Sequence, residues 1–310
     1  MAISNLFRLD AVILPSNDIQ AITRQDWTDG VNTIFERGAG GIRPLFTGVS
    51  RQEPEIRFST PQIDKILDDI EPGAPLAISS ALTTYFKKMG QTGHVARATT
   101  SHQSAAVNYG LAYIDRINLE AEGNSTVDVV ICCGFDGTND PIVFTGSVAL
   151  DATDLASPDH FAVGPVSING SAVAGIQRVT IESGVTIVKE FGEGDVWPTF
   201  VGLETTEPMI RITTKEVAPF VTAGVDGLAL DGSNGVVCYA RRLTQSQAGG
   251  VARVANATAS HIKFTALNGK YHCSASGQGS SSIDNEILVA LRTTADGTAE
   301  ITVDNASAIT

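Results

Sequence analysis

The chain has 310 residues, a formal net charge of −13 and a sequence pI of about 4.7. This acidity argues against a protein that reads nucleic-acid sequence, because such proteins normally present a basic face. The length allows two domains of ordinary size, each with its own core. Few aromatic residues beside abundant Gly, Ala, Val, Ser and Thr are typical of a β-rich assembly protein, although any β protein rich in small residues has this composition.

A gapless internal repeat dominates the sequence. Residues 30–60 align with residues 184–214 at a constant shift of 154, which is close to half the chain length. The identical pairs include Gly30/Gly184, Pro44/Pro198, Phe46/Phe200, Gly48/Gly202, Pro54/Pro208, Ile56/Ile210, Arg57/Arg211 and Thr60/Thr214. The repeat predicts one domain written twice, over residues 1–155 and 156–310, with a linker in the polar segment 151–158.

The predicted elements follow the same order in both copies. Each copy opens with an apolar strand (9–14 and 163–168), followed by two strands (31–35 and 44–49; 185–188 and 198–203) that flank a Gly-rich connection. Each connection ends in a proline, which is acceptable at a strand's first residue. We expect each unit to be two strands joined by a flexible connection, and an ordinary surface hairpin is the alternative. A third strand follows (55–59 and 209–213), with Arg57 and Arg211 on its outward side by alternation.

One clear helix is predicted in the first copy. Thr60 is a suitable N-cap and Pro61 suits the first helical position. Apolar side chains then recur on a single stripe until the helix ends before Pro72, namely Ile63, Ile66, Leu67 and Ile70. The second copy has Pro219 inside the corresponding segment, which predicts a short or distorted helix over Val217, Phe220, Val221 and Gly224.

The ends of the copies also correspond. Strands are expected at 83–89 and 237–243, and they carry the basic pairs Lys87-Lys88 and Arg241-Arg242, which face either a partner's acids or solvent. Each copy then closes with two apolar runs around an Asp-Gly turn, at Asp136-Gly137 and Asp296-Gly297. Asp-Gly between apolar runs predicts a hairpin.

The residues that carry chemistry form no catalytic or cofactor motif. The glycines after Glu36 lack the GxGxxG spacing and lead into a strand, and Ser101-His102 and Ser260-His261 are adjacent residues that face opposite ways in a strand. The histidines show no metal-ligand spacing and are expected in loops or on the surface: His94, His102, His160, His261 and His272. We therefore predict a protein that is not an enzyme and needs no cofactor or metal.

The sequence shows no pattern typical of a signal peptide or a membrane-spanning helix. No apolar run of signal-peptide length precedes Asp10, and no segment approaches the ~20 apolar residues of a membrane helix. We expect synthesis in the cytosol without membrane insertion. The cysteines form no CxxC pair, which predicts free thiols at Cys132, Cys133, Cys238 and Cys273.

The repeated unit resembles the tail tube protein, or major tail protein, of bacteriophages with long non-contractile tails. The residues that carry the resemblance are Pro44, Phe46, Gly48, Pro54, Ile56, Arg57 and Thr60, with Pro198, Phe200, Gly202, Pro208, Ile210, Arg211 and Thr214 in the second copy. The resemblance implies two tandem antiparallel β-sandwich or barrel domains, each with one short flanking α-helix. Most family members carry one such domain and form hexameric rings, so a doubled chain implies a trimer with pseudo-six-fold symmetry.

The resemblance further implies a place in the virion. The rings would assemble in the host cytoplasm and stack into a tube, with the tail terminator, tape measure and tail-tip proteins as partners. DNA would pass through the lumen without specific binding, and a wall of carboxylates would repel its phosphates. The Gly-rich connections 36–43 and 190–197 are the expected inter-ring contacts, through Glu36, Arg37, Arg43, Glu190, Glu193, Asp195 and Trp197.

Two other functions fit the sequence less well. A capsid decoration or tail-tip ring protein would form discrete rings or trimers that never extend. A glycan-active enzyme would need carboxylates ~5–10 Å apart across a groove between the domains.

Overall fold

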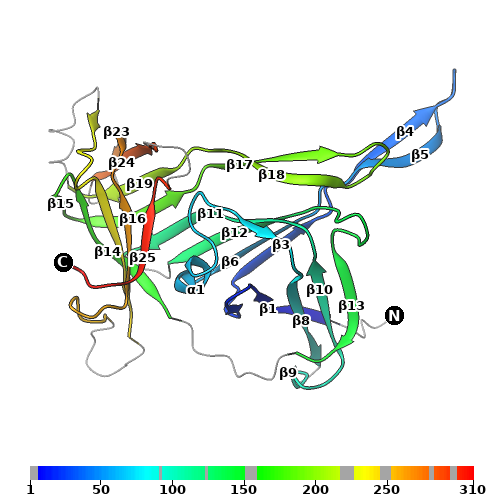
Figure 1. Ribbon diagram of the computed structural model, residues 1–310, viewed down its shortest axis with the longest axis horizontal. Helices are drawn as coiled ribbons and strands as arrows, with labels where there is room; N and C mark the ends of the chain where they lie inside the picture. Colours follow the sequence, from blue (N-terminus) through cyan, green and yellow to red (C-terminus); the bar gives the residue numbers. More distant parts are fainter. Residues whose placement is uncertain are drawn as a thin grey trace.

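The computed structural model describes residues 6–90, 93–122, 125–150, 159–216, 227–244, 253–278, 283–293 and 299–310, with only the backbone for 273–278 and 283–284. Nearly all regular structure in these residues is antiparallel β, as predicted. The strands form one large sheet, two smaller sheets and two separate hairpins (Figure 1).

The large sheet has ten strands and runs through both halves of the chain. In spatial order it contains β20 (Leu228–Ala229), β23 (Gly269–Gln278), β24 (Ile283–Leu291), β19 (Met209–Thr214), β16 (Ile176–Glu182), β11 (Gly110–Glu120), β12 (Thr126–Cys133), β6 (Glu55–Thr60) and β3 (Arg24–Thr28), while β7 (Leu76–Ile78) pairs with β11 beside this path.

The two smaller sheets each belong to one half. The first has the order β13 (Val143–Val148), β10 (His102–Val107), β8 (Leu82–Gly90), β1 (Leu6–Ile13) and β2 (Asp18–Ile19), with β9 (Gly93–His94) beside β8. The second has the order β25 (Thr302–Ser307), β22 (His261–Ala266), β21 (Val236–Arg242), β14 (Phe161–Ile168) and β15 (Ser171–Val173).

The sequence repeat is also a repeat of strand pairing. Val12 lies opposite Ile19 and Thr84, and Val166, 154 residues later, lies opposite Val173 and Cys238. The bulge in β11 between Ile114 and Arg116 recurs in β23 at an offset of 159 residues. The division at residues 155 and 156 stays a prediction, because residues 151–158 lie outside the described part of the chain.

The two halves do not have separate cores, contrary to the sequence-based expectation. One buried cluster contains side chains from all three sheets, among them Val12, Phe58, Ile117, Ile181, Ile212 and Phe264. The reason is that β11 of the first half pairs with β16 of the second, so the large sheet and the core beneath it continue across the junction.

The helix of the first half is shorter than predicted. Helix α1 spans Ile63–Leu67 and its N-cap is Gln62, which makes no side-chain capping bond. Thr60 still ends strand β6 opposite Val127, and its hydroxyl accepts a hydrogen bond from the Gln62 amide at 3.1 Å. Ile63, Ile66, Leu67 and Ile70 are buried as expected. The predicted helix at Val217 lies outside the described residues.

The Asp-Gly hairpin predicted at Asp136-Gly137 is wrong. The Asp136 carboxylate accepts hydrogen bonds from the amides of Thr138 and Asn139, so a local turn does form. However, β12 belongs to the large sheet and β13 pairs with β10 in a smaller one. The turn therefore links two sheets rather than two paired strands. Strands β24 and β25 are separated in the same way, and Asp296-Gly297 itself is outside the described residues.

The two predicted strand pairs with Gly-rich connections are long β-hairpins. They are β4 (Asn32–Arg37) with β5 (Pro44–Arg51), and β17 (Val185–Phe191) with β18 (Pro198–Thr206). Gly30 and Gly184 begin them with φ of +57° and +59°, and a Cβ at either position would collide with backbone atoms of Glu53 or Glu207. Glycine is thus required at both hairpin bases.

Two histidines expected in loops or on the surface are buried. His102 accepts a hydrogen bond from the Lys88 amide at Nδ1 (2.9 Å), and its Nε2 donates to the Ala96 carbonyl (2.9 Å). His261 binds the Arg242 amide and the Ala255 carbonyl in the same way. A neutral imidazole that accepts at one nitrogen and donates from the other satisfies two backbone groups at once.

The single described helix is far too short to cross a bilayer.

Candidate self-assembly interface

The junction between the two halves joins opposite ends of the repeat. Residues 116–120 of β11 pair with residues 178–182 of β16. Strand β11 is at one end of the first repeat's share of the sheet, and β16 is the counterpart of β3, at the other end. The contact is therefore head-to-tail, and two units joined in this way together keep one unused copy of each contact surface.

The second hairpin completes this junction. Hairpin β17–β18 runs back over the first half (Figure 1), where it covers the outer face of the large sheet, the face opposite the core. Val201 and Ile187 pack there against a small cluster of Leu111, Val130 and Cys132. Burial under the hairpin raises the pKa of the Cys132 thiol to about 12, which leaves it un-ionised at neutral pH.

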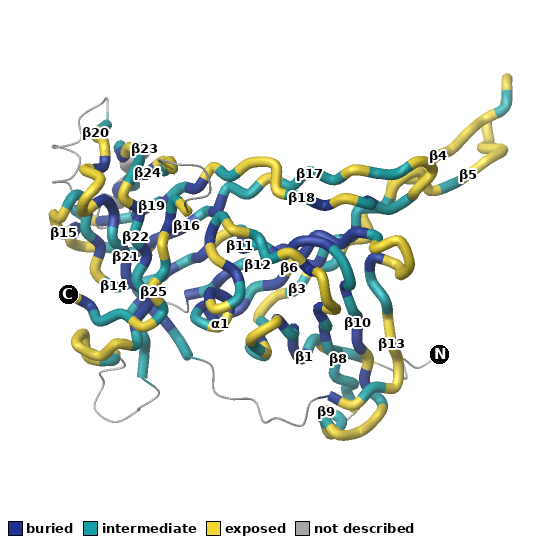
Figure 2. The backbone as a smooth tube through the Cα atoms, in the orientation of Figure 1, coloured by how far each residue is buried: buried dark blue, intermediate teal, exposed yellow. Residues whose placement is uncertain are grey.

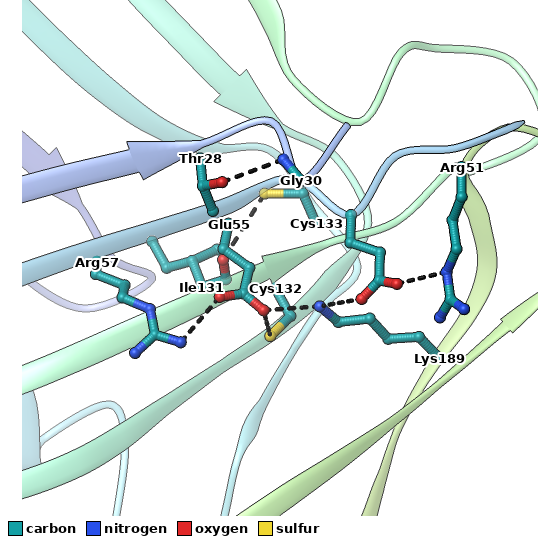
Figure 3. Close-up of polar contacts among 10 residues, drawn as sticks. Thr28, Gly30, Arg51, Glu55, Arg57, Ile131, Cys132, Cys133 and Lys189 are labelled. Atoms are coloured by element: carbon teal, nitrogen blue, oxygen red, sulfur yellow. Dashed lines mark hydrogen bonds and ion pairs between the residues drawn. The ribbon is translucent and has the colours of Figure 1, made fainter. Parts of the chain in front are cut away.

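Lys189 ties the hairpin to the sheet with ion pairs (Figure 3). Its ammonium lies 2.7 Å from the Glu55 carboxylate and 3.3 Å from that of Glu53. Arg57 donates to the other Glu55 oxygen at 3.0 Å. Burial opposes the charge on Glu55, but the hydrogen bonds and charges of Lys189 and Arg57 outweigh it and lower the pKa of this carboxyl. The pKa of Lys189 is raised for the matching reason, since bonding to Glu55 outweighs burial.

The end of the hairpin is fixed by aromatic contacts. The Trp197 indole donates to the Gln52 side chain at 2.6 Å and lies 5.5 Å from the Phe135 ring. The Arg51 guanidinium lies 4.2 Å from the centre of the Phe191 ring. Backbone bonds from Gln52 to Val196 and from Phe135 to Pro198 add to these contacts.

At one end of the large sheet, strand β3 and hairpin β4–β5 present the same kind of surface that β16 and β17–β18 use in the junction, but without a partner strand in the described residues. Among the described residues, β3 pairs with β6 alone, although its counterpart β16 pairs on both sides. Hairpin β4–β5 projects from the body and is exposed almost throughout (Figures 1 and 2). It carries large apolar side chains in solvent: Ile34, Phe35, Ile42, Leu45, Phe46 and Val49, with Phe35 62% exposed.

The other end presents the complementary half. Strand β23 corresponds to β11, and beyond its two-residue pairing with β20 its far edge is unpaired within the described residues. The outer-face positions that match Leu111, Val130 and Cys132 are Lys270, Leu288 and Ala290. None of these three is buried, whereas all three of their counterparts are.

The outer face of the large sheet carries paired charges. Each arginine that the structure places there contacts at least one carboxylate, in the pairs Arg24–Asp26, Arg57–Glu55, Arg116–Asp128, Arg178–Glu120 and Arg211 with both Glu182 and Glu286. The face therefore combines both signs and is not lined by acids alone.

The residues predicted as inter-ring contacts lie on the two hairpins. Six are exposed, namely Glu36, Arg37, Arg43, Glu190, Glu193 and Asp195, whereas Trp197 is half-buried in its contacts with Gln52 and Phe135. Their role between rings stays a prediction. From the sequence, Lys189 opposite Phe35 in the repeat hints at two non-identical contacts, but the pairing of Lys189 with Glu55 was not predicted.

No group of His, Cys, Asp and Glu suited to a metal ion occurs in the described residues. Cys132, Cys133 and Cys238 are free thiols, as predicted, and the side chain of Cys273 lies outside the described part. No protein-family model matches the chain, and no curated protein matches it significantly.

Proposed function

We propose that the chain is the subunit of a phage tail tube, in which three chains form a ring of six repeats and the rings stack into a DNA-conducting tube. The observation that carries the proposal is the head-to-tail junction between β11 and β16. The two ends of the large sheet present the counterparts of these two surfaces, and both are open in the described residues. A heterologous contact of this kind produces a ring where the rotation closes.

The junction gives the register of the contact between chains. Matching β23 to β11 and β3 to β16 sets residues 275–278 of one chain opposite residues 25–28 of the next. The exposed β4–β5 hairpin of that second chain then lies over β23 and β24 of the first. Closure of the ring would cover every long open edge of the large sheet, and uncovered edges otherwise invite aggregation.

The chemistry of the outer face suits a channel for DNA. With the cores of the repeats packed outward, this face would line the lumen, and its arginines are already occupied by carboxylates. The net charge of −13 adds a general repulsion of phosphate. Phe200 and Leu203 stay exposed on the docked hairpin, as do Phe46 and Val49 on the free one, and these apolar side chains suit contacts with the next ring.

The proposal is tested by the mass and shape of the purified protein, measured by light scattering and negative-stain microscopy. Wild type is expected to form three-chain rings and, at high concentration or with a tail-tip initiator, tubes of constant diameter. A discrete ring that never extends would favour a decoration or tail-tip protein, and a monomer under all conditions would contradict both.

A proline in β3 tests whether its open edge forms the contact between chains. The Ser183 amide donates to Asp115 in β11, so alternation turns the amide of Gln25 in β3 toward the open edge. Gln25→Pro removes this donor and is tolerated in an edge strand. We expect a folded monomer that forms no rings. Asp26→Pro, which removes an amide facing β6, is expected to damage the fold itself.

A further inference from the structure

The two hairpins differ at several positions that face the sheet, among them Ile187/Thr33 and Val201/Thr47, but a charged side chain is exchanged for an aromatic one only at a single position of this kind. Lys189 in β17 corresponds to Phe35 in β4 at the repeat shift of 154. Lys189 is held between carboxylates, with only 10% of its side chain exposed, whereas Phe35 is 62% exposed. The same backbone position therefore presents an ammonium in one hairpin and an aromatic ring in the other.

The surfaces beneath the hairpins differ in the matching way. Glu55 pairs with Lys189 in the first repeat, and its counterpart in the second repeat is Met209. Cys132 lies opposite Glu55 in the sheet, and Ala290 lies opposite Met209. The surface of the second repeat thus has a thioether and a methyl group where the first has a carboxylate and a thiol.

We propose that this exchange determines which hairpin binds which repeat. Lys189 with Glu55 fixes the second hairpin on the first repeat of its own chain, and Phe35 binds Met209 and Ala290, beside Lys270, on the second repeat of another copy of this chain. The inference rests on the proposed ring and adds the residues that give its contacts their order.

Both wrong combinations are unfavourable for physical reasons. Lys189 over Met209 and Ala290 would lose its closer carboxylate, Glu55 at 2.7 Å, and keep only Glu207, the counterpart of Glu53. Removing one partner of a largely buried charge is destabilising. Phe35 over Glu55 would bury the carboxylate under an aromatic ring and remove its ammonium partner. Specificity then comes from the penalty on the wrong pair as much as from the right contact.

The apolar contact also explains the exposed ring. Phe35 belongs to a hairpin whose large apolar side chains are exposed, and Met209 and Ala290 are not buried. A second copy of the chain supplies both halves of the contact, in an arrangement that β17–β18 already adopts on the first repeat.

A charge exchange tests the proposal. Phe35→Lys places an ammonium over Met209 and is expected to lower the fraction of chains in rings about ten-fold or more. Adding Met209→Glu recreates the Lys189–Glu55 pair between chains and is expected to restore rings. Leu6→Lys, at an exposed apolar position of β1, is the control and should leave assembly unchanged.

The outcomes separate this proposal from the proposed function. Absence of rings in wild type would overturn both. Rings in wild type that persist in Phe35→Lys, or a double variant with no more rings than Phe35→Lys alone, would overturn the specificity proposal and leave the ring intact. The melting temperature of every variant is measured, so that a loss of rings in a folded chain is distinguished from unfolding.

Discussion

Two buried histidines stabilise equivalent turns in the two halves. Each imidazole satisfies one backbone amide and one carbonyl, His102 between Lys88 and Ala96, and His261 between Arg242 and Ala255. These rings have no exposed surface. Their role is structural, and it recurs at the same place in each repeat.

Removal of either ring is expected to destabilise the fold. His102→Ala leaves a buried amide and a buried carbonyl without partners, and each unsatisfied group costs about 1–3 kcal/mol. We expect the urea midpoint of the isolated chain to fall markedly. His94→Ala, in the exposed strand β9, is the control and should change it little. Equal midpoints for the two variants would contradict this role.

Acid is expected to release the second hairpin. Burial alone would raise the pKa of Glu55, but the hydrogen bonds and charges of Lys189 and Arg57 outweigh it, so the pKa is lowered in the folded state. Its contribution is therefore fully present above the ordinary glutamate value of about 4.3 and is lost as pH falls through the lowered folded value. The hairpin should open only in strongly acidic solution.

Trp197 reports this opening. Trp27→Phe leaves Trp197 as the single tryptophan, and its emission should shift to the red as it leaves Phe135 and Gln52. Lys189→Met keeps the aliphatic stem but removes the pair, so the acid transition should become shallower and begin from a looser hairpin. An unchanged pH profile in Lys189→Met would show that the pair does not hold the hairpin.

At the level of elements, the two hairpins have one geometry and different surroundings. Gly30 and Gly184 need the same positive φ at the base of each hairpin, and a Cβ there meets backbone. Hairpin β17–β18 packs on its own chain, whereas β4–β5 projects into solvent. The same substitution should therefore have different consequences in the two hairpins.

Gly184→Ala is expected to lower the melting temperature of the isolated chain, because its hairpin contributes packing on Leu111 and Val130. Gly30→Ala is expected to lower that temperature less and to impair ring formation, since β4–β5 is exposed almost throughout and its contact with β17–β18 is near its base, between Arg51 and Phe191. Differential scanning calorimetry and light scattering measure the two effects. A large loss of monomer stability in Gly30→Ala would contradict this difference.

The sequence predicted most of the strands but not which strands pair with one another. Period-two alternation, a local signal, predicted β6 and β19 with Arg57 and Arg211 outward. The repeat indicated the strands of both hairpins, although a hairpin was only the alternative interpretation. The Asp-Gly turns suggested paired strands, but pairing depends on which sheet each strand joins, and that is decided by distant residues. The pairing of β11 with β16 carries no local signal, so the shared core could not be predicted.

The contacts of the candidate interface depend in the same way on distant residues. The hairpin connections were predicted as inter-ring contacts; Glu36 and Arg43 are exposed there, and their role between rings stays a prediction. Trp197 was assigned to a partner although it contacts Gln52 in its own chain. Lys189 and Glu55 lie 134 residues apart, and only the folded chain brings them together.

At the level of the whole molecule, the chain is a pair of repeats joined by the contact that we propose to operate between chains. Strand β3 and hairpin β4–β5 form one surface, and β23 with β24 forms its complement. A single internal junction would therefore specify the register, the direction and the covering hairpin of the proposed ring.

Cryo-electron microscopy of the assembled protein tests this claim most directly. The account predicts a three-fold ring with six similar lobes, in which residues 275–278 of one chain pair with residues 25–28 of the next and Phe35 lies over Met209 of the neighbour. A ring with another number of chains, or one whose chains meet through surfaces other than the β3 and β23 edges, would contradict it.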